Sequence, residues 1–183
     1  MSNPGRVGSR RVYTGRVISL DVDTVRFPNG TTGDLEMVRH PGASAIVPFL
    51  SDPAGEDPQI LLIRQYRYAA EGYLYEIPAG RLERGEDPAI CARRELLEET
   101  GCTALRVDHV YSFFTTPGFT DERIHLFVAT GLTRGEARHE ADEFMEVEPT
   151  NLSKALSMVR QGEISDAKSA LGILYAAGYL AGR

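Results

Sequence analysis

The 183-residue sequence has no tryptophan, only two cysteines, and no run of about 18 apolar residues that could cross a membrane. If a helix separates Cys91 from Cys102, the two lie roughly 16 Å apart, which is too far for a disulfide. We therefore expect a reducing, cytoplasmic location. The opening residues, MSNPGRVGS, have no apolar core, so we expect no signal peptide.

Basic residues are also in the minority. Twenty Lys and Arg residues stand against 26 Asp and Glu residues, which gives a net charge of −6. Phosphate backbones call for basic surfaces, so we expect neither a nucleic-acid partner nor, without an apolar span, a membrane partner. A small anionic substrate is compatible with this charge, because a bound metal ion and nearby arginines outweigh it locally.

Acidic residues are most concentrated in residues 80–102, GRLERGEDPAICARRELLEETGC. Glu95, Glu98 and Glu99 fall within five positions, just before Gly101. Three carboxylates this close repel one another unless a cation holds them. The stretch therefore predicts a metal site, and with it a site for a ligand that the metal binds.

Helix signals surround these glutamates. Asp87 can cap a helix, Pro88 suits its first position, and Gly101 suits the left-handed residue after its last turn. These signals predict a helix over residues 88–100. At roughly 100° per residue, one arc of this helix is apolar and the opposite arc carries the three glutamates, with Arg94 at its edge. The apolar arc consists of Ala89, Ile90, Ala92, Leu96 and Leu97.

The spacing of the whole stretch resembles the Nudix box, which is Gly, five residues, Glu, seven residues, then Arg-Glu-Leu-x-Glu-Glu-x-Gly. The matching positions are Gly80, Glu86, Arg94, Glu95, Glu98, Glu99 and Gly101. Cys102 occupies a slot where Ile, Leu or Val is usual, and a small buried thiol can pack there. The resemblance implies a hydrolase that cleaves a nucleoside diphosphate linked to another group.

The resemblance also implies roles for these residues. Glu95 and Glu99 would bind a divalent cation directly, with Glu98 as a direct, water-mediated or catalytic group. Mg²⁺ is expected, with Mn²⁺ or another divalent ion as an alternative, because hard cations prefer oxygen ligands. The carbonyl of Ala79 would be a further ligand, and Arg94 would orient the glutamates.

Three other positions in the box have expected local roles. Gly80 and Gly85 are expected to serve backbone conformation. Glu86 either ties the loop to the helix or is a first-turn acid favoured by the helix dipole.

Segments outside the box resemble the ADP-ribose pyrophosphatase branch of this family. Pro117 and Gly118 follow the box at a similar distance, and an acidic residue comes shortly after them. EIPAG before the box and GEISDAKSALGILYAAGYL near the end resemble the same branch. The resemblance implies that Arg67 binds the substrate phosphate or terminal ribose, and that Arg64 and Gly118 are further substrate-binding residues. Glu122 is a candidate for binding the distal ribose or a metal.

The acidic tract GEARHEADEFMEVEP resembles the late loop that brings a catalytic carboxylate to the metal ions. Glu143 fits that role best because EFMEV then continues into a strand, and Glu140 is the second candidate.

The expected fold class is α+β. The resemblance implies a Nudix fold, an α/β/α sandwich with a mixed sheet in residues 41–183, preceded by a small antiparallel sheet in residues 1–40. The N-terminal region would form a homodimer and cover the substrate, and its first nine residues read as disordered. Expected strands cover residues 12–19, 22–27, 35–40, 45–50, 60–66, 73–77, 107–114, 124–129 and 144–147. Further helices are expected over 151–161 and 166–180.

The leading hypothesis is Mg²⁺-dependent hydrolysis of ADP-ribose to AMP and ribose 5-phosphate. Hydrolysis of another nucleoside diphosphate sugar, such as GDP-mannose, is the alternative within the same class. A non-catalytic Nudix module that only binds its ligand is the alternative from a different class.

Overall fold

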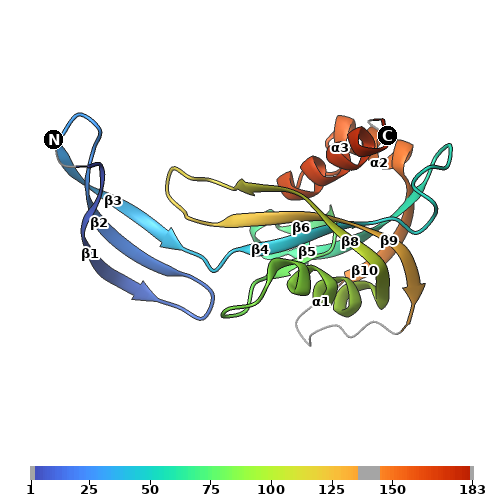
Figure 1. The fold of residues 1–183 in the computed structure, drawn as a ribbon, viewed down its shortest axis with the longest axis horizontal. Helices are drawn as coiled ribbons and strands as arrows, with labels where there is room; N and C mark the ends of the chain where they lie inside the picture. Colours follow the sequence, from blue (N-terminus) through green and yellow to red (C-terminus); the bar gives the residue numbers. More distant parts are fainter. Residues whose placement is uncertain (1–2, 136–144, 182–183) are drawn as a thin grey trace. The chain divides into compact units, whose positions relative to one another are not determined.

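The computed structural model describes residues 3–135 and 145–181 (Figure 1). Its elements in chain order are β1 (Gly5–Thr14), β2 (Ser19–Arg26), β3 (Thr32–Arg39), β4 (Ala43–Pro48), β5 (Gln59–Arg67), the 3₁₀ helix η1 (Tyr68–Ala70), β6 (Gly72–Glu76), β7 (Ala79–Arg81), α1 (Pro88–Thr100), β8 (Cys102–Phe114), β9 (Arg123–Arg134), β10 (Met145–Asn151), α2 (Leu152–Gln161) and α3 (Ala167–Ala181). The α+β prediction is confirmed, and the predicted helix over residues 88–100 matches α1 at both ends.

The N-terminal prediction was wrong in two respects. Residues 5–9 belong to β1 and are not disordered, and the chain turns at residues 15–18, where a strand was expected. Every residue of β1 is exposed, so no alternation of apolar and polar residues marked it. Its pairing with β2, from Gly5 opposite Arg26 to Thr14 opposite Ser19, orders it instead.

The contacts divide the chain into two compact units. The first, called the sheet unit below, contains Met1–Gly42 and Phe113–Ile124. The second, called the core unit, contains Ala43–Ser112 and His125–Arg183. The predicted domain boundary after residue 40 remains a prediction.

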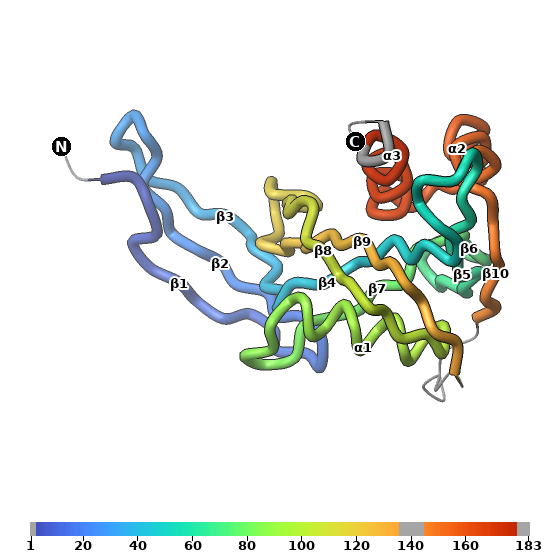
Figure 2. Tube along the Cα trace, turned by 45° about the vertical axis from the view of Figure 1, so that its right-hand side comes forward, coloured from blue at the N-terminus to red at the C-terminus, as the bar shows by residue number. Residues whose placement is uncertain are grey.

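The core unit contains two sheets, with strand orders β10-β5-β6 and β7-β4-β9-β8. Helices α1 and α3 lie on opposite sides of β4 in both views of the chain (Figures 1 and 2). Alternating side chains of β4 explain this arrangement. Ile46 belongs to a cluster with Leu96 of α1, while Val47 lies against Gly172 of α3.

The close packing at Gly172 is possible because glycine has no side chain. A Cβ there would lie 2.8 Å from Ile77 and 3.2 Å from Val47, so a larger residue would push α3 off the sheet. Leu61 of β5 and Phe127 of β9 complete the α1 side of this core.

The sheet unit is built differently. Its three strands pair antiparallel in the order β1-β2-β3, and its buried β2 side chains are Asp21 and Asp23. Arg39 binds both of these carboxylates and also Asp121, to which its Nη1 donates at 3.0 Å. Arg11 adds a second cation to Asp21.

Among the described residues, no helix is long and apolar enough to span a bilayer.

Candidate active site

Helix α1 begins and ends where the sequence predicted. The carboxylate of Asp87 accepts hydrogen bonds from the backbone N–H groups of Ala89 and Ile90, at 2.8 and 3.3 Å. Gly101 has a φ of 70°, and its N–H donates to the carbonyl of Leu97. These caps fix the two ends of the helix that carries the glutamates.

The predicted arcs of α1 were only partly right. Ile90, placed on the apolar arc, is 61% exposed. Glu95 and Glu99, expected on the arc opposite the apolar residues, are only 7% and 2% exposed. They lie one turn apart and are buried together with Cys91, Ala92 and Leu96. Part of the acidic side of the helix is therefore buried. The spacing of apolar residues could not predict this, because a helix side that carries charges is assumed to face solvent.

Small residues in β7 make room for the two buried carboxylates. A Cβ on Gly80 would lie 1.9 Å from Oε1 of Glu95, so only glycine leaves space for that carboxylate. The expected conformational role applies to Gly85, whose φ is 79°, whereas Gly80 is needed for close approach. Beside it, the N–H of Ala79 donates to Oε2 of Glu99 at 3.0 Å. The predicted ligand carbonyl thus belongs to a residue that is hydrogen-bonded to α1, the helix predicted to bind the metal.

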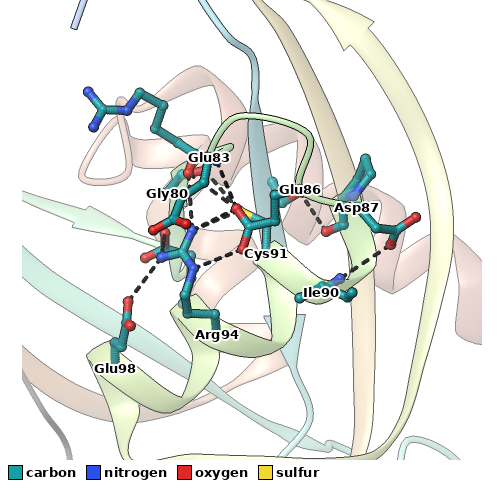
Figure 3. A network of polar contacts seen from close by, with 12 residues as sticks. Gly80, Glu83, Glu86, Asp87, Ile90, Cys91, Arg94 and Glu98 are labelled. Atoms are coloured by element: carbon teal, nitrogen blue, oxygen red, sulfur yellow. Dashed lines mark hydrogen bonds and ion pairs between the residues drawn. The ribbon is translucent and has the colours of Figure 1, made fainter. Parts of the chain in front are cut away.

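Arg94 forms hydrogen bonds to carboxylates of α1 and of the loop before it (Figure 3). Its Nη1 donates to Glu95 at 2.6 Å and to Glu98 at 3.0 Å. Its Nε and Nη2 donate to Glu86 at 2.9 and 3.0 Å. Glu86 also accepts the N–H of Glu83, so it ties the loop to the helix, the first of the two roles expected for it.

These contacts shift the titration of the groups involved. Hydrogen bonding from Arg94 lowers the pKa of Glu86, and Glu86 in turn raises the pKa of Arg94. Burial raises the pKa of Cys91 to about 12, with Glu95 adding to the effect. Cys91 is therefore a neutral packing thiol, and the charges of the site are carried by glutamates and arginines.

The donor set of α1 fits a hard divalent cation in its chemistry, since all of its candidate side-chain ligands are carboxylates. Glu98 is only partly buried and reaches solvent. Within residues 3–135 and 145–181, however, no three His, Cys, Asp or Glu side chains converge closely enough to hold a metal ion by themselves. One arginine, Arg94, contacts two of the three glutamates.

Arg67, predicted to bind substrate, projects from the end of β5 onto a carboxylate of β6. Its Nε and Nη2 donate to the two oxygens of Glu76, at 2.7 and 2.8 Å. Glu76 raises the pKa of Arg67, and the charge of Glu99 adds to this. Arg67 is therefore fixed to the buried carboxylate at the end of β6.

The other predicted substrate-binding residues are divided between the core unit and the sheet unit. Arg64 projects from the opposite face of β5 to Arg67, over the Tyr73 ring at 4.3 Å and beside Glu146. Glu122 belongs to the sheet unit, where it accepts a hydrogen bond from Thr115 and lies 3.4 Å from His40.

Gly118 also belongs to the sheet unit, and a Cβ there would meet no atom within 4 Å. Glu140 and Glu143, the candidates for a catalytic carboxylate, lie outside the described residues.

Sequence reasoning missed two buried polar residues beside Arg67. Glu76 is 1% exposed at the end of an otherwise apolar strand, and that isolated acid was the available signal. Gln65 is also buried, and its Oε1 has no hydrogen-bond partner in the part of the chain that the structure describes. Nothing in the local sequence distinguishes Gln65 from a surface residue of an edge strand.

Comparisons with known proteins agree with this geometry. The NUDIX domain model matches residues 40–169. The chain is 41% identical over 171 residues to the methanol dehydrogenase activator of Bacillus methanolicus, and 40% identical over 171 residues to the ADP-ribose pyrophosphatase of Bacillus subtilis (strain 168). Each alignment covers 92% of this chain and 90% of the relative.

A solved structure described as an ADP compounds hydrolase superposes with a TM-score of 0.83. The superposition covers 100% of this chain and 96% of that one, at 20% sequence identity. At that identity the likeness supports the fold, which agrees with the sandwich expected from the sequence.

Proposed function

We propose that this chain, which belongs to the Nudix family and is a hydrolase of that family, cleaves the pyrophosphate bond of a nucleoside diphosphate sugar. ADP-ribose is the proposed substrate, and AMP and ribose 5-phosphate are the proposed products. The observation that carries the proposal is the pair of buried glutamates, Glu95 and Glu99, one turn apart on α1 against Gly80 and Ala79.

The proposed cofactor is Mg²⁺, with Mn²⁺ as an alternative. Glu95, Glu98 and Glu99 would hold it, together with the carbonyl of Ala79. When bound, such an ion supplies charge neutralisation at the phosphates and lowers the pKa of a bound water. The contribution of the chain is to fix the carboxylates, which the Gly80 contact and the Ala79 N–H do before any ligand arrives.

Arginines would supply the remaining positive charge. Arg94 keeps Glu95 and Glu98 oriented, as its hydrogen bonds to both require. Arg67 would bind a phosphate or the terminal ribose, because a guanidinium fork matches such oxygens. Glu143 remains the proposed general base and Glu140 the second candidate.

Similarity alone does not choose the substrate. The two Bacillus relatives differ by one percentage point in identity, yet one is named for hydrolysis of ADP-ribose and the other for activation of another enzyme. ADP-ribose is preferred because Pro117, Gly118 and the EIPAG segment resemble the ADP-ribose pyrophosphatase branch of the family. GDP-mannose remains the alternative substrate, and a ligand-binding module without catalysis remains the alternative class.

The test is a panel of ADP-ribose, ADP-mannose, GDP-mannose, NADH and diadenosine polyphosphates, each with and without Mg²⁺. Phosphate released by an added phosphatase reports cleavage. Fastest turnover of ADP-ribose, only with the metal, is expected. Faster turnover of another compound would make that compound the proposed substrate. Tight binding of a compound with no turnover of any compound would support the alternative of a non-catalytic binding module.

A homodimer formed through the sheet unit and a cytoplasmic location are also proposed. All of β1 is exposed, including Val7, Val12 and Tyr13, and it is an edge strand of its sheet. The unpaired backbone N–H and C=O groups of an exposed edge strand can pair with a strand of another chain. Light scattering across concentrations tests this, and a single monomeric species throughout would remove the proposal.

A further inference from the structure

The carboxylate of Glu76 is buried at the end of β6 between two cations from distant parts of the chain. Arg67 donates two hydrogen bonds to it, and Nζ of Lys168 donates a third. Burial alone would raise the pKa of Glu76, but hydrogen bonding from Arg67 and the charge of Lys168 outweigh it and lower that pKa. Glu76 is therefore an ionised anchor to which Arg67 is fixed.

The bidentate contact leaves one edge of the Arg67 guanidinium available. Nε and Nη2 are committed to Glu76, whereas Nη1 donates to no protein atom among residues 3–135 and 145–181. The side chain of Arg67 is 40% exposed, so this edge can meet a ligand from solvent. Anchored in this way, the guanidinium loses little rotamer freedom when it binds an anion.

Lys168 is placed by the first turn of α3. Its Nζ also donates to Asp166 at 2.9 Å, and its side chain is only 13% exposed. Asp166 accepts the N–H and the hydroxyl of Ser169, and the Ser169 hydroxyl accepts the N–H of Ile77 at 2.8 Å. The same turn thus holds both the side chain of Glu76 and the backbone next to it.

We propose that Lys168 is a positioning residue for substrate binding, acting through Glu76 on Arg67. This rests on the proposed function, because it assumes that Arg67 meets the diphosphate or ribose of the substrate. Lys168 itself is too buried to be the main ligand contact. Without its charge, Glu76 keeps one cation instead of two, and the guanidinium is no longer confined to a single direction.

The test compares Lys168→Met and Lys168→Arg with the wild type in ADP-ribose hydrolysis. Lys168→Met is expected to raise KM about tenfold while kcat changes less than about threefold, the pattern of lost uniform binding. Lys168→Arg keeps the charge and should restore most of the affinity. Lys154→Met, at an exposed lysine of α2, is the matched control and should leave both constants unchanged.

A double-mutant cycle separates positioning from general damage to the fold. If Lys168 acts through Arg67, Lys168→Met adds less than about twofold to KM in an Arg67→Lys background. Full additivity of the two effects, or a KM of Lys168→Met within twofold of the wild type, would overturn the proposal. If Lys168→Met does not fold, Lys168→Gln takes its place, since it removes the charge but keeps a donor.

Calorimetric titration with a non-hydrolysable ADP-ribose analogue gives a readout independent of turnover. The same order of affinities is expected, with Lys168→Met about tenfold weaker than the wild type. Binding without hydrolysis by the wild type would refute the proposed function but leave the positioning role supported. A wild-type protein that neither binds nor cleaves would refute both.

Discussion

Both units of the molecule bury carboxylates, but they balance them differently. In the sheet unit, Asp21, Asp23 and Asp121 share two arginines, Arg11 and Arg39. At α1 in the core unit, Arg94 binds three carboxylates, those of Glu86, Glu95 and Glu98. Glu99, buried close by, accepts a backbone N–H from Ala79.

We expect this difference to separate a structural use of buried charge from a functional one. In the sheet unit, Arg11 of β1 and Arg39 of β3 bind the buried aspartates of β2, so these ion pairs hold the three strands together. At α1, two buried glutamates lie one turn apart on one helix, which is the arrangement proposed to bind a divalent cation. The apolar cores show the same contrast, since the buried β2 side chains of the sheet unit are aspartates while β4 and β5 are filled with Ile, Leu and Val.

The largest expected effect is on catalysis. Glu99→Gln should lower the rate of ADP-ribose hydrolysis about a hundredfold or more at saturating Mg²⁺, because it removes the charge of a proposed metal ligand. Its melting temperature without metal should stay the same or rise, since the amide oxygen can still accept the Ala79 N–H. Asp21→Asn should instead lower the melting temperature, because Arg11 and Arg39 lose an anionic partner.

Steady-state kinetics and thermal unfolding of both variants measure this contrast. Glu163→Gln, at an exposed glutamate after α2, is the control. A near-wild-type rate for Glu99→Gln would remove the functional interpretation of the acidic cluster.

A second expected effect concerns packing. Leu61→Ala should lower the free energy of unfolding by about 2–5 kcal/mol, because Leu61 is buried against α1 and leaves a cavity. Leu35→Ala in β3 removes the same atoms from an exposed site and should cost much less. Urea unfolding measures both, and equal losses would mean that the sheet unit has an apolar core comparable to that of the core unit.

The third expected effect is pH-dependent. Arg11 and Arg39 lower the pKa of Asp21, and Ser9 and Arg39 lower that of Asp23. A carboxyl whose pKa is lower in the folded state stabilises the fold above its unfolded pKa, about 3.9, and that stability is lost as the pH falls through the folded pKa. The sheet unit should therefore lose stability below about pH 4, and Arg39→Met should reduce this dependence.

Methyl NMR signals of Val22 and Val25 report on the sheet unit, and those of Ile46 and Leu61 on the core unit, during acid titration. An Arg39→Met protein with the same acid response as the wild type would contradict the role given to these ion pairs.

The smallest expected effect is a gain of stability. Gln65→Leu should raise the melting temperature slightly, because a buried oxygen without a protein partner is replaced by an apolar group of similar size. Differential scanning calorimetry measures the change, with Gln59→Leu at the partly exposed start of β5 as the control. A clear loss of stability would contradict the prediction that Oε1 of Gln65 costs stability in the folded protein.

Local signals predicted α1 and most strand positions. Asp87, Pro88 and Gly101 act within a few residues of the helix ends, so the bounds of α1 could be deduced without the rest of the fold. The expected strands of residues 60–66 and 73–77 correspond to β5 and β6 within one residue at each end. Where side chains gave no alternation, as in β1, the prediction failed because pairing partners decided the structure.

By itself, the sequence determined the type and spacing of the carboxylates, the helix that carries them and the family to which the pattern belongs. All of these depend on residues close together in the chain. The tertiary structure alone decided that Glu95 and Glu99 are buried, that Gly80 admits one of them, and that Arg67 is anchored to Glu76. Lys168 reaches Glu76 across 92 positions of the chain, and no local propensity encodes a contact that only the packing of α3 brings about.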